Sequence, residues 1–274
     1  MLKIKEYVKA ESLKQAYELN QKKSNCILGG MLWLKMSDRM IQKAIDLSGL
    51  GLDTIEETEE SFSIGCMVTL RQLELHLKLN EWTKGAIGDC VKGIVGVQFR
   101  NLATIGGSIF GRFGFSDVLT CFLALDTYVE LHQGGVIPLE QFVRLKKDRD
   151  ILVRIIVKKT PIECIYMTHR NAKTDFPVLA CAAALSGHAD NCRGYVVAGA
   201  RPGRAVRIEI GTEDVMRIRA GACTKEELRG LAAGLARKIP TGSNMRASAE
   251  YRSHLAEVLL FRCLSRLQER GGEA

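Results

Sequence analysis

The chain has 274 residues, of which 46% are hydrophobic and 26% are charged, and its formal net charge is +8. These values exclude a disordered or fibrous protein, and the length allows about two compact domains. No DNA- or RNA-reading motif accompanies the positive charge, so nucleic-acid binding is not expected, and the basic excess is interpreted as a solvated surface or as a patch that docks an acidic partner subunit.

The first fifty residues predict a small β-α-β unit. Residues 3–8 are expected to form a strand, and Ser12-Leu-Lys-Gln15 has the pattern of a capping box, which satisfies the first free amides of a helix. A helix is therefore expected through Leu19. Two short apolar segments, residues 25–28 and 44–47, are predicted strands on either side of the first pair of glycines.

A second region begins with a strand. Hydrophobic residues alternate from residue 62 to residue 66, the period of two that indicates a half-buried strand. A second capping box at residues 69–72 predicts a helix with Leu70, Leu73 and Leu77 on one face.

The middle of the chain alternates between helix and strand. Residues 118–125 are predicted to form a helix, and residues 128–131 and 151–157 are predicted strands that flank the Gly134-Gly135 turn.

The last third predicts strands followed by helices. Strands are expected at residues 162–167, 178–185 and 195–200, and helices after a third capping box at residues 224–227 and over residues 249–267. This order predicts an α+β domain with a three-stranded antiparallel sheet.

The sequence predicts neither a membrane segment nor a metal site. Its apolar runs fall well short of the ~18 residues that cross a bilayer, and the N-terminus lacks the pattern of an export signal, so a cytoplasmic location without membrane association is expected. The nine cysteines form no C-x-x-C motif and no close set of four, which argues against zinc or an iron-sulphur cluster. They are interpreted as buried residues of a reduced protein. No catalytic residue is assigned, because no histidine is patterned with a nucleophile.

Two pairs of glycines, Gly29-Gly30 and Gly106-Gly107, each follow an apolar run. Glycine suits positions where the backbone needs a positive φ or approaches a ligand closely, and successive exposed amides can bind a phosphate. Neither pair lies in G-x-G-x-x-G or in a P-loop motif, which disfavours the Rossmann fold and the nucleoside triphosphatases. Two such turns could hold one pyrophosphate between two subdomains, although each pair alone could also be an ordinary turn.

Several longer strings follow one another in a recognisable order and spacing. They are ILGGMLWLK at residues 27–35, IDLS at 45–48, IGCMVTL at 64–70, QFRNLATIGGS at 98–108, SD at 116–117, IPLEQF at 137–142, DFPVL at 175–179, GARPG at 199–203 and NMRASAEYR at 244–252. In these strings nearly the whole chain resembles the FAD-binding medium subunits of molybdenum hydroxylases, the xanthine dehydrogenase and carbon monoxide dehydrogenase flavoprotein family.

The resemblance implies an α+β fold with two domains. Residues 1–160 are expected to form a two-lobed FAD-binding domain of the vanillyl-alcohol oxidase type, with subdomains at about 1–52 and 53–160. Residues 161–274 are expected to form the C-terminal domain of the carbon monoxide dehydrogenase flavoprotein type, which would contain the antiparallel sheet.

The resemblance also implies an electron-transfer function. The chain is expected to pass electrons from the iron-sulphur clusters of a partner subunit, which holds two 2Fe-2S clusters, through FAD to NAD or another acceptor. A molybdopterin-binding subunit would oxidise the substrate.

The family's FAD contacts map onto three places in this sequence. The first glycine loop would be Leu28, Gly29, Gly30, Met31, Leu32 and Trp33, and the second Thr104, Ile105, Gly106, Gly107 and Ser108. Asp117 would contact the ribose or adenine side, or else would belong to an ordinary helix cap with Ser116, and Ile94 would lie near the flavin ring, or else in the core.

The chain departs from the family's pattern at some of these positions. Met31 and Leu32 stand where the family has a hydroxyl or amide residue and an acidic one, which removes two hydrogen bonds worth about 0.5–1.5 kcal/mol each. Ser108 replaces the usual asparagine, and Met167 stands where the family commonly has a lysine. If no other group replaces these hydrogen bonds, the altered first loop is expected to bind FAD less tightly.

The loop at residues 110–115 is unusually aromatic and contains Arg112. Arg112 is interpreted either as a charge-assisted phosphate contact or as a solvated loop residue.

Two other functions stay open from the sequence. One is a scaffold subunit that has lost or weakened FAD binding, which the altered first loop would permit. The other is a stand-alone FAD-dependent reductase, comparable to the enolpyruvyl-sugar reductases, although no catalytic acid stands out in the C-terminal domain.

Overall fold

The computed structural model describes residues 1–187 and 191–271, which divide into two compact units. The first unit consists of Met1–Leu73, Gly96–Gly111 and Thr127–Lys158, and the second of Glu74–Val95, Arg112–Asp126 and Lys159–Ala274. Each unit therefore contains segments that are distant in the sequence. None of the helices in the described ranges combines the length and hydrophobicity that a bilayer crossing requires.

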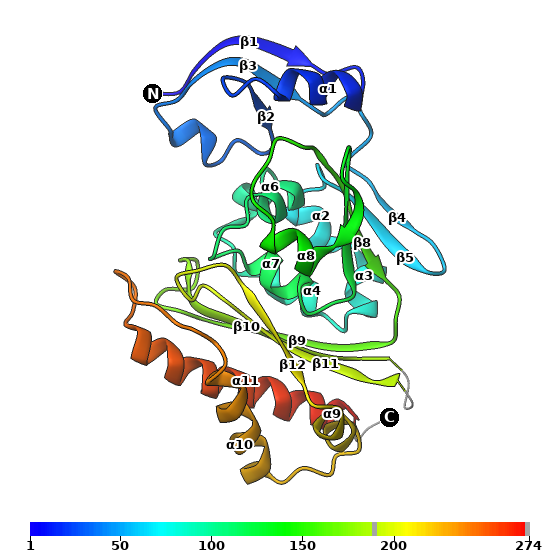
Figure 1. Ribbon diagram of the computed structural model, residues 1–274, viewed down its shortest axis with the longest axis vertical. Coiled ribbons are helices and arrows are strands. Elements are labelled where there is room, and N and C mark those ends of the chain that lie inside the picture. Colours follow the sequence, from blue (N-terminus) through cyan, green and yellow to red (C-terminus); the bar gives the residue numbers. More distant parts are fainter. Residues whose placement is uncertain (188–190, 272–274) are drawn as a thin grey trace. The chain divides into compact units, whose positions relative to one another are not determined.

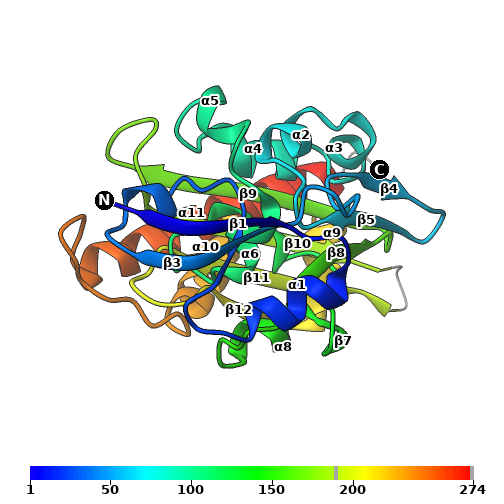
Figure 2. The same cartoon turned by 90° about the horizontal axis from the view of Figure 1, so that it is seen from above.

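The first unit begins with the predicted β-α-β unit. Its three parallel strands lie in the order β1-β3-β2, and β1 and β3 run side by side in both views (Figures 1 and 2). The elements are β1 (Lys3–Lys9), α1 (Leu13–Asn20), β2 (Cys26–Leu28), the 3-10 helix η1 (Leu34–Met36) and β3 (Met40–Asp46). A small core of Leu28, Ile41 and Ala44 is buried between these elements. The prediction of this unit is confirmed, with the third strand beginning earlier than expected.

A five-stranded antiparallel sheet makes up most of the rest of the first unit. Its order is β4-β5-β8-β6-β7. The strands are β4 (Ile55–Glu57), β5 (Ser61–Gly65), β6 (Thr127–Leu131), β7 (Gly135–Pro138) and β8 (Leu152–Lys158), and the helices are α2 (Leu70–Leu75), α5 (Val97–Arg100), α6 (Ile105–Phe110) and α8 (Leu139–Arg144). Helix α6 contacts the central strand β8. The sheet thereby supports the second glycine pair, which lies in α6.

The helix predicted after residue 69 is shorter than expected. Leu70 and Leu73 are buried, but α2 ends at Leu75, and the imidazole of His76 accepts a hydrogen bond from the Leu79 amide (3.2 Å) to cap the next helix, α3 (Leu77–Trp82). Leu77 begins that new helix and is 76% exposed. The prediction that Leu77 shares a buried face with the other leucines is wrong, because the helix axis changes at the histidine cap.

The second unit is built on a four-stranded antiparallel sheet. Its order is β12-β11-β10-β9, with β9 (Ile162–Arg170), β10 (Pro177–Ser186), β11 (Arg193–Gly199) and β12 (Val206–Ile210). The prediction of three strands is therefore wrong. The fourth strand lies at the edge of the sheet, where charged residues alternate with apolar ones and no long apolar run forms.

Helices cover both faces of this sheet. On one side lie α9 (Thr212–Arg219), α10 (Lys225–Ala236) and α11 (Ala249–Gly271), and on the other α4 (Ala86–Lys92) and α7 (Asp117–Phe122), as Figure 1 shows. Strand β10 is buried along nine of its ten residues as a consequence, and its sequence is an almost unbroken apolar run.

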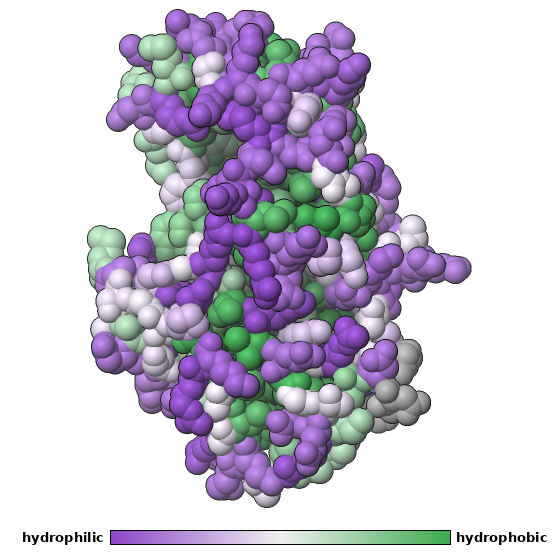
Figure 3. All heavy atoms as spheres, in the orientation of Figure 1, coloured by the Kyte–Doolittle hydropathy of each residue, from purple (hydrophilic) through white to green (hydrophobic). Residues whose placement is uncertain are grey.

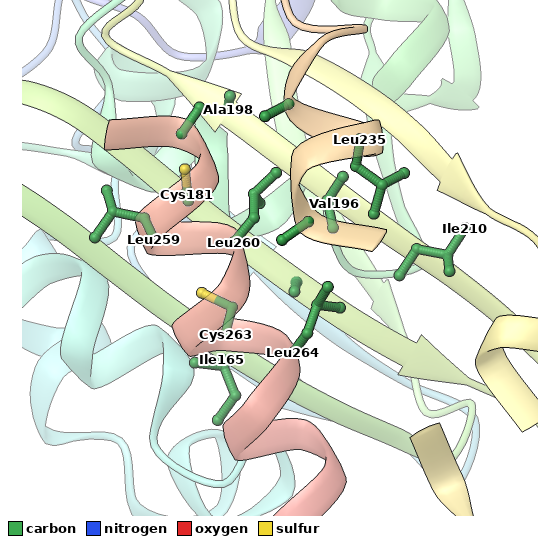
Figure 4. Close-up of a cluster of buried hydrophobic side chains, with 14 of the residues drawn as sticks. Ile165, Cys181, Val196, Ala198, Ile210, Leu235, Leu259, Leu260, Cys263 and Leu264 are labelled. Carbon is green, nitrogen blue, oxygen red and sulfur yellow. The ribbon is translucent and has the colours of Figure 1, made fainter. Parts of the chain in front are cut away.

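The core of the second unit fills the space between the sheet and the C-terminal helices. Cys181, Val196 and Ala198 point from the sheet toward Leu260 and Leu264 of α11 (Figure 4). All five side chains are essentially inaccessible to water. Burial of this apolar surface, worth about 25 cal/mol per Å², is the main stabilisation of the unit.

The predicted capping boxes at Thr69 and Thr224 are confirmed, whereas at Ser12 only half of the box forms, because the Gln15 side chain accepts from the Glu11 amide instead. At Thr224, the hydroxyl accepts from the Glu227 amide (3.2 Å) while the Glu227 carboxylate accepts from the Thr224 amide (2.7 Å).

Hydrophilic residues predominate on the face of the molecule drawn in Figure 3, and hydrophobic residues show in separate areas between them.

Candidate functional site

The first glycine pair forms a tight turn directly after β2. A Cβ atom on Gly30 would lie 1.9 Å from the carbonyl oxygen of Leu102, and one on Gly29 would lie 3.1 Å from Oγ1 of Thr104. Met31 follows with a positive φ of 58°, an uncommon conformation for a residue with a side chain. The turn therefore packs directly against the segment that leads into the second glycine pair.

The second glycine pair lies in the first turn of α6. Thr104 caps this helix, because its hydroxyl accepts from the Gly107 amide (3.1 Å). Gly106 donates its amide to the Cys66 carbonyl (2.9 Å), and a Cβ atom there would approach the same oxygen to 2.5 Å. Ser108 donates its hydroxyl to the Thr104 carbonyl (3.1 Å). The second turn thus requires glycine at position 106, and Thr104 caps the helix in which this turn lies.

A cavity of about 450 Å³ within the first unit connects the two turns. Its lining includes Leu28 and Gly29 from the first turn and Thr104, Gly106 and Gly107 from the second. Two glycine turns from distant parts of the sequence therefore border one cavity.

Basic residues line the same cavity. Arg39, Lys147 and Arg149 are among the lining residues, and the Arg149 guanidinium donates to the carbonyl oxygens of Lys22 (2.9 Å) and Asn25 (3.0 Å). None of these three basic residues was predicted from the sequence. They lie in charged surface-like segments whose spacing gives no signal, and only the fold brings them to the glycine turns.

The other residues of the first loop point elsewhere. Met31 packs partly buried against the small core of the β-α-β unit, and Trp33 is 44% exposed and meets Phe99 edge to face at 6.4 Å between ring centroids. Leu32 is half-buried. None of these three residues is among those lining the cavity.

The fit to a phosphate-bearing cofactor therefore depends on the backbone. Gly29 and Gly106 could not carry a Cβ atom without steric crowding, and the cavity that they border has basic residues on its wall. This arrangement suits the phosphates of FAD, because glycines leave room for a ligand close to the backbone and cations bind phosphate oxygens.

Two predicted FAD contacts, Ile94 and Asp117, lie in the second unit. Ile94 follows α4, is half-buried and donates its amide to the Val91 carbonyl (2.9 Å). The helix-cap interpretation is correct for Ser116, whose hydroxyl accepts from the Leu119 amide (3.1 Å). Asp117 is the first residue of α7 rather than its cap.

The Asp117 carboxylate is buried and paired. Its Oδ1 atom accepts from the Arg170 guanidinium (2.6 Å) and from the Tyr166 hydroxyl. Burial raises the pKa of Asp117, although the positive charge of Arg170 and the two hydrogen bonds oppose that shift. Arg170 supplies a cation on β9 three residues after Met167, the position where the family's lysine is missing.

The interpretation of Arg112 as a solvated residue is wrong. Its side chain is only 4% exposed, and its φ is +47°. The fold buries this guanidinium group, and the sequence pattern of the aromatic loop alone could not predict that burial.

Two of the nine cysteines, Cys26 and Cys66, line the cavity. All nine are free thiols, and seven are buried. Burial raises the pKa of Cys66, which lines the cavity, to about 12, so this thiol stays protonated. In the ranges that the structure describes, no group of histidine, cysteine and acidic residues is arranged to hold a metal ion.

Comparison with known proteins agrees with this geometry. The family model described as the FAD binding domain in molybdopterin dehydrogenase matches residues 2–160, and the one described as the CO dehydrogenase flavoprotein C-terminal domain matches residues 165–267. The fold and the paired turns define a flavoprotein of the molybdenum hydroxylase type. The chain belongs to this FAD-binding flavoprotein family of the molybdopterin dehydrogenases, and its cofactor is FAD.

Similar individual proteins share the whole length of the chain. The uncharacterized protein YgfM of Escherichia coli strain K12 is 24% identical over 99% of both chains. Quinoline 2-oxidoreductase from Pseudomonas putida 86 has a TM-score of 0.82 at 16% identity, covering 97% of this chain and 98% of that one. Carbon monoxide dehydrogenase from Hydrogenophaga pseudoflava has a TM-score of 0.82 at 20% identity, covering 97% of each chain. The two structural likenesses concern the fold.

Proposed function

We propose that this chain is the electron-transfer subunit of a xanthine dehydrogenase-like molybdenum hydroxylase. It takes electrons from two 2Fe-2S clusters of a partner subunit and delivers them to NAD or another acceptor, while a molybdopterin-binding subunit oxidises the substrate. Bound FAD supplies the redox chemistry, and the chain supplies binding, orientation and electrostatics. The observation that best supports this proposal is that the two glycine turns contact each other and border one cavity.

Within this proposal the glycine turns hold the diphosphate of FAD. The backbone of the first turn and the basic side chains of Arg39 and Lys147 bind the phosphates, and Gly106 and Gly107 leave room for them. These contacts replace the side-chain contacts that Met31 and Leu32 do not make. The proposed FAD-binding residues are Leu28, Gly29, Gly30, Met31, Leu32, Trp33, Ile94, Thr104, Ile105, Gly106, Gly107, Ser108 and Asp117.

The same proposal includes the domain organisation and the cellular location. Residues 1–160, with subdomains 1–52 and 53–160, form the FAD-binding domain, and residues 161–274 form the C-terminal domain; the ends of the two family matches support this boundary. The complex works in the cytoplasm, a reducing compartment that suits nine free thiols.

The visible absorption spectrum of the purified chain tests the flavin part of the proposal. We expect the two bands of an oxidised flavin, and release of FAD rather than FMN on denaturation. A colourless chain that also fails to bind added FAD would instead identify a scaffold subunit.

Co-expression with the neighbouring reading frames tests the subunit part. We expect the chain to copurify with subunits that contain two 2Fe-2S clusters and molybdopterin. Rapid substrate turnover by the isolated chain with NADH would contradict the proposal and indicate a stand-alone reductase.

A further inference from the structure

Arg149 lies in the segment before β8 and is hydrogen-bonded to the loop between α1 and β2. Its guanidinium donates to the carbonyl oxygens of Asn20, Lys22 (2.9 Å) and Asn25 (3.0 Å), and to the side-chain oxygen of Asn20 (3.2 Å). In return, the Arg149 carbonyl accepts from the side-chain amides of Asn20 (2.8 Å) and Gln21 (3.2 Å). These six hydrogen bonds join Arg149 to residues 20–25, hereafter the arginine clasp.

The arginine clasp satisfies the C-terminal end of α1. This helix ends at Asn20, and the last carbonyl oxygens of a helix have no partner within it and carry a partial negative charge. Asn20 and Asn25 are only 7% and 2% exposed, so water hardly reaches their polar groups. A buried carbonyl oxygen without a hydrogen bond is costly, and a guanidinium group can serve several such oxygens at once. Arg149 therefore stabilises the course of the loop.

The loop leads directly into the first glycine turn. Strand β2 has only three residues, Cys26–Leu28, and joins Asn25 to Gly29. Asn25, Gly29 and every residue between them line the cavity. The Asn25 side chain also donates to the Leu19 carbonyl (2.7 Å) and accepts from the Lys43 amide of β3 (3.2 Å). A displacement of the loop at Asn25 would therefore move the wall of the cavity and the turn that follows it.

The other side of the arginine clasp is fixed to the five-stranded sheet. The buried Asp150 carboxylate accepts from the amides of Gln133 (3.1 Å) and Gly134 (2.8 Å) in the turn between β6 and β7. Strand β8 begins at Leu152 and contacts α6, the helix that contains the second glycine pair. Arg149 thus attaches the first turn to the sheet that supports the second turn.

We propose that Arg149 is a positioning residue of the FAD site. Through the arginine clasp it holds the first glycine turn where this turn can bind the cofactor together with the second. Arg149 acts through the loop, because Nε and Nη2 of its guanidinium are engaged by protein oxygens. This role depends on the proposed function, in which the two turns hold the diphosphate of FAD, and it adds a residue that belongs to neither turn.

Fluorescence titration of the full-length chain, stripped of flavin, with FAD tests this role. Arg149→Gln should bind FAD about tenfold more weakly than the wild type, the effect of losing about one charge-assisted hydrogen bond. Arg149→Lys keeps the charge but not the planar arrangement of donors, so it should recover little of the loss. Wild-type affinity in the lysine variant would overturn the inference and indicate a charge that attracts the phosphates directly.

Asn20→Ala tests the arginine clasp from the other side. It removes one acceptor and one donor of the clasp and should weaken FAD binding about threefold. The double variant with Arg149→Gln should bind FAD no more weakly than Arg149→Gln by itself, because both changes break the same contacts. Additive losses would mean that Arg149 acts on FAD independently of the loop, which would also overturn the inference.

Trypsin cleavage reports on the loop without FAD. Lys22 and Lys23 are exposed in the loop, and cleavage after them requires the backbone to open locally. We expect faster cleavage at this site in Arg149→Gln than in the wild type, with the N-terminal peptide identified by mass spectrometry. Weaker FAD binding at an unchanged cleavage rate would contradict a positioning role.

Arg144→Gln is the matched control. Arg144 belongs to the same unit, but its side chain is 75% exposed and is not among those lining the cavity. We expect this variant to have the FAD affinity of the wild type and the same rate of cleavage after Lys22 and Lys23. Thermal unfolding confirms that each variant is folded.

The titration distinguishes two failures. A wild-type chain that binds no FAD would overturn the proposed function and the role of Arg149 with it. A chain that binds FAD equally well as the wild type and as Arg149→Gln would overturn the role of Arg149 alone.

Discussion

Gly30 and Leu102 are in backbone contact, so close that a Cβ atom on the glycine would lie 1.9 Å from the leucine carbonyl oxygen. The contact joins the turn after β2 to the segment before α6, which lies more than seventy positions further along the chain. A peptide oxygen cannot move aside as the end of a flexible side chain can. Only glycine at position 30 therefore allows the two turns to pack against each other.

The first prediction concerns this contact. Gly30→Ala should push the turns apart, with a steric cost of about 1–3 kcal/mol, and so weaken FAD binding by about tenfold or more and lower the Tm. Gly230→Ala on α10 is the control, since a Cβ atom there would meet nothing within 4 Å. Flavin fluorescence titration and thermal unfolding measure both effects. Equal losses in the two variants would contradict the role of the Leu102 contact.

The second prediction concerns the cap of α6. Thr104→Ala removes the hydrogen bond to the Gly107 amide and should destabilise the protein by about 1 kcal/mol, with weaker FAD binding. Thr104→Ser keeps the hydroxyl and should retain most of both. Urea unfolding at constant temperature gives the free energies. A serine variant as weak as the alanine variant would show that the methyl group, and not the cap, matters.

The third prediction concerns the buried ion pair of the second unit. Asp117→Asn leaves the Arg170 guanidinium buried without its counter-charge and should cost about 3–5 kcal/mol. Tyr166→Phe removes a single hydrogen bond and should cost about 1 kcal/mol. The double variant Asp117→Asn, Arg170→Gln should recover part of the loss, as a double-mutant cycle in denaturant measures. Additive losses would mean that the pair is not coupled.

The fourth prediction concerns pH. The hydrogen bond from Arg217, with those from Thr224, lowers the pKa of Glu227 from 4.5 to about 2. A carboxyl group whose pKa is lower in the folded state contributes stability above its unfolded pKa and loses that contribution as the pH falls. The wild type should therefore exceed Glu227→Gln in stability above about pH 4.5, and the difference should shrink toward pH 2. A difference independent of pH, measured by denaturant unfolding, would exclude this carboxylate as its source.

The fifth prediction concerns thiol reactivity. Cys26 and Cys223 are partly exposed and should be alkylated first by iodoacetamide in the native protein, whereas Cys66, with its raised pKa, should react only after unfolding. Mass spectrometry of the modified peptides gives the order. Native-state modification of Cys66 would show that the wall of the cavity opens.

Local features were predictable because their causes are local. The hydroxyl cap of Ser12 and the capping boxes of Thr69 and Thr224 involve partners only three positions away, and each helix begins where its pattern places it. The alternation from Val206 to Ile210 was also a local signal for the fourth strand of the second unit, and it was overlooked between a glycine-rich turn and a helical region.

The sequence by itself determined the family, the cofactor and the glycine turns, because strings of adjacent residues carry them and the backbone freedom of glycine is a property of a single position. The tertiary structure decided which groups lie beside the turns and which charged groups are buried together. Three features depend on segments far apart in the chain: the hydrogen bond from Arg149 to the Asn25 carbonyl, the ion pair of Arg170 with Asp117, and the burial of Arg112. Such contacts form only when hydrophobic burial drives the sheets to fold. Burial also strengthens the attraction between opposite charges, since an ion pair is weak in water and strong in a protein interior.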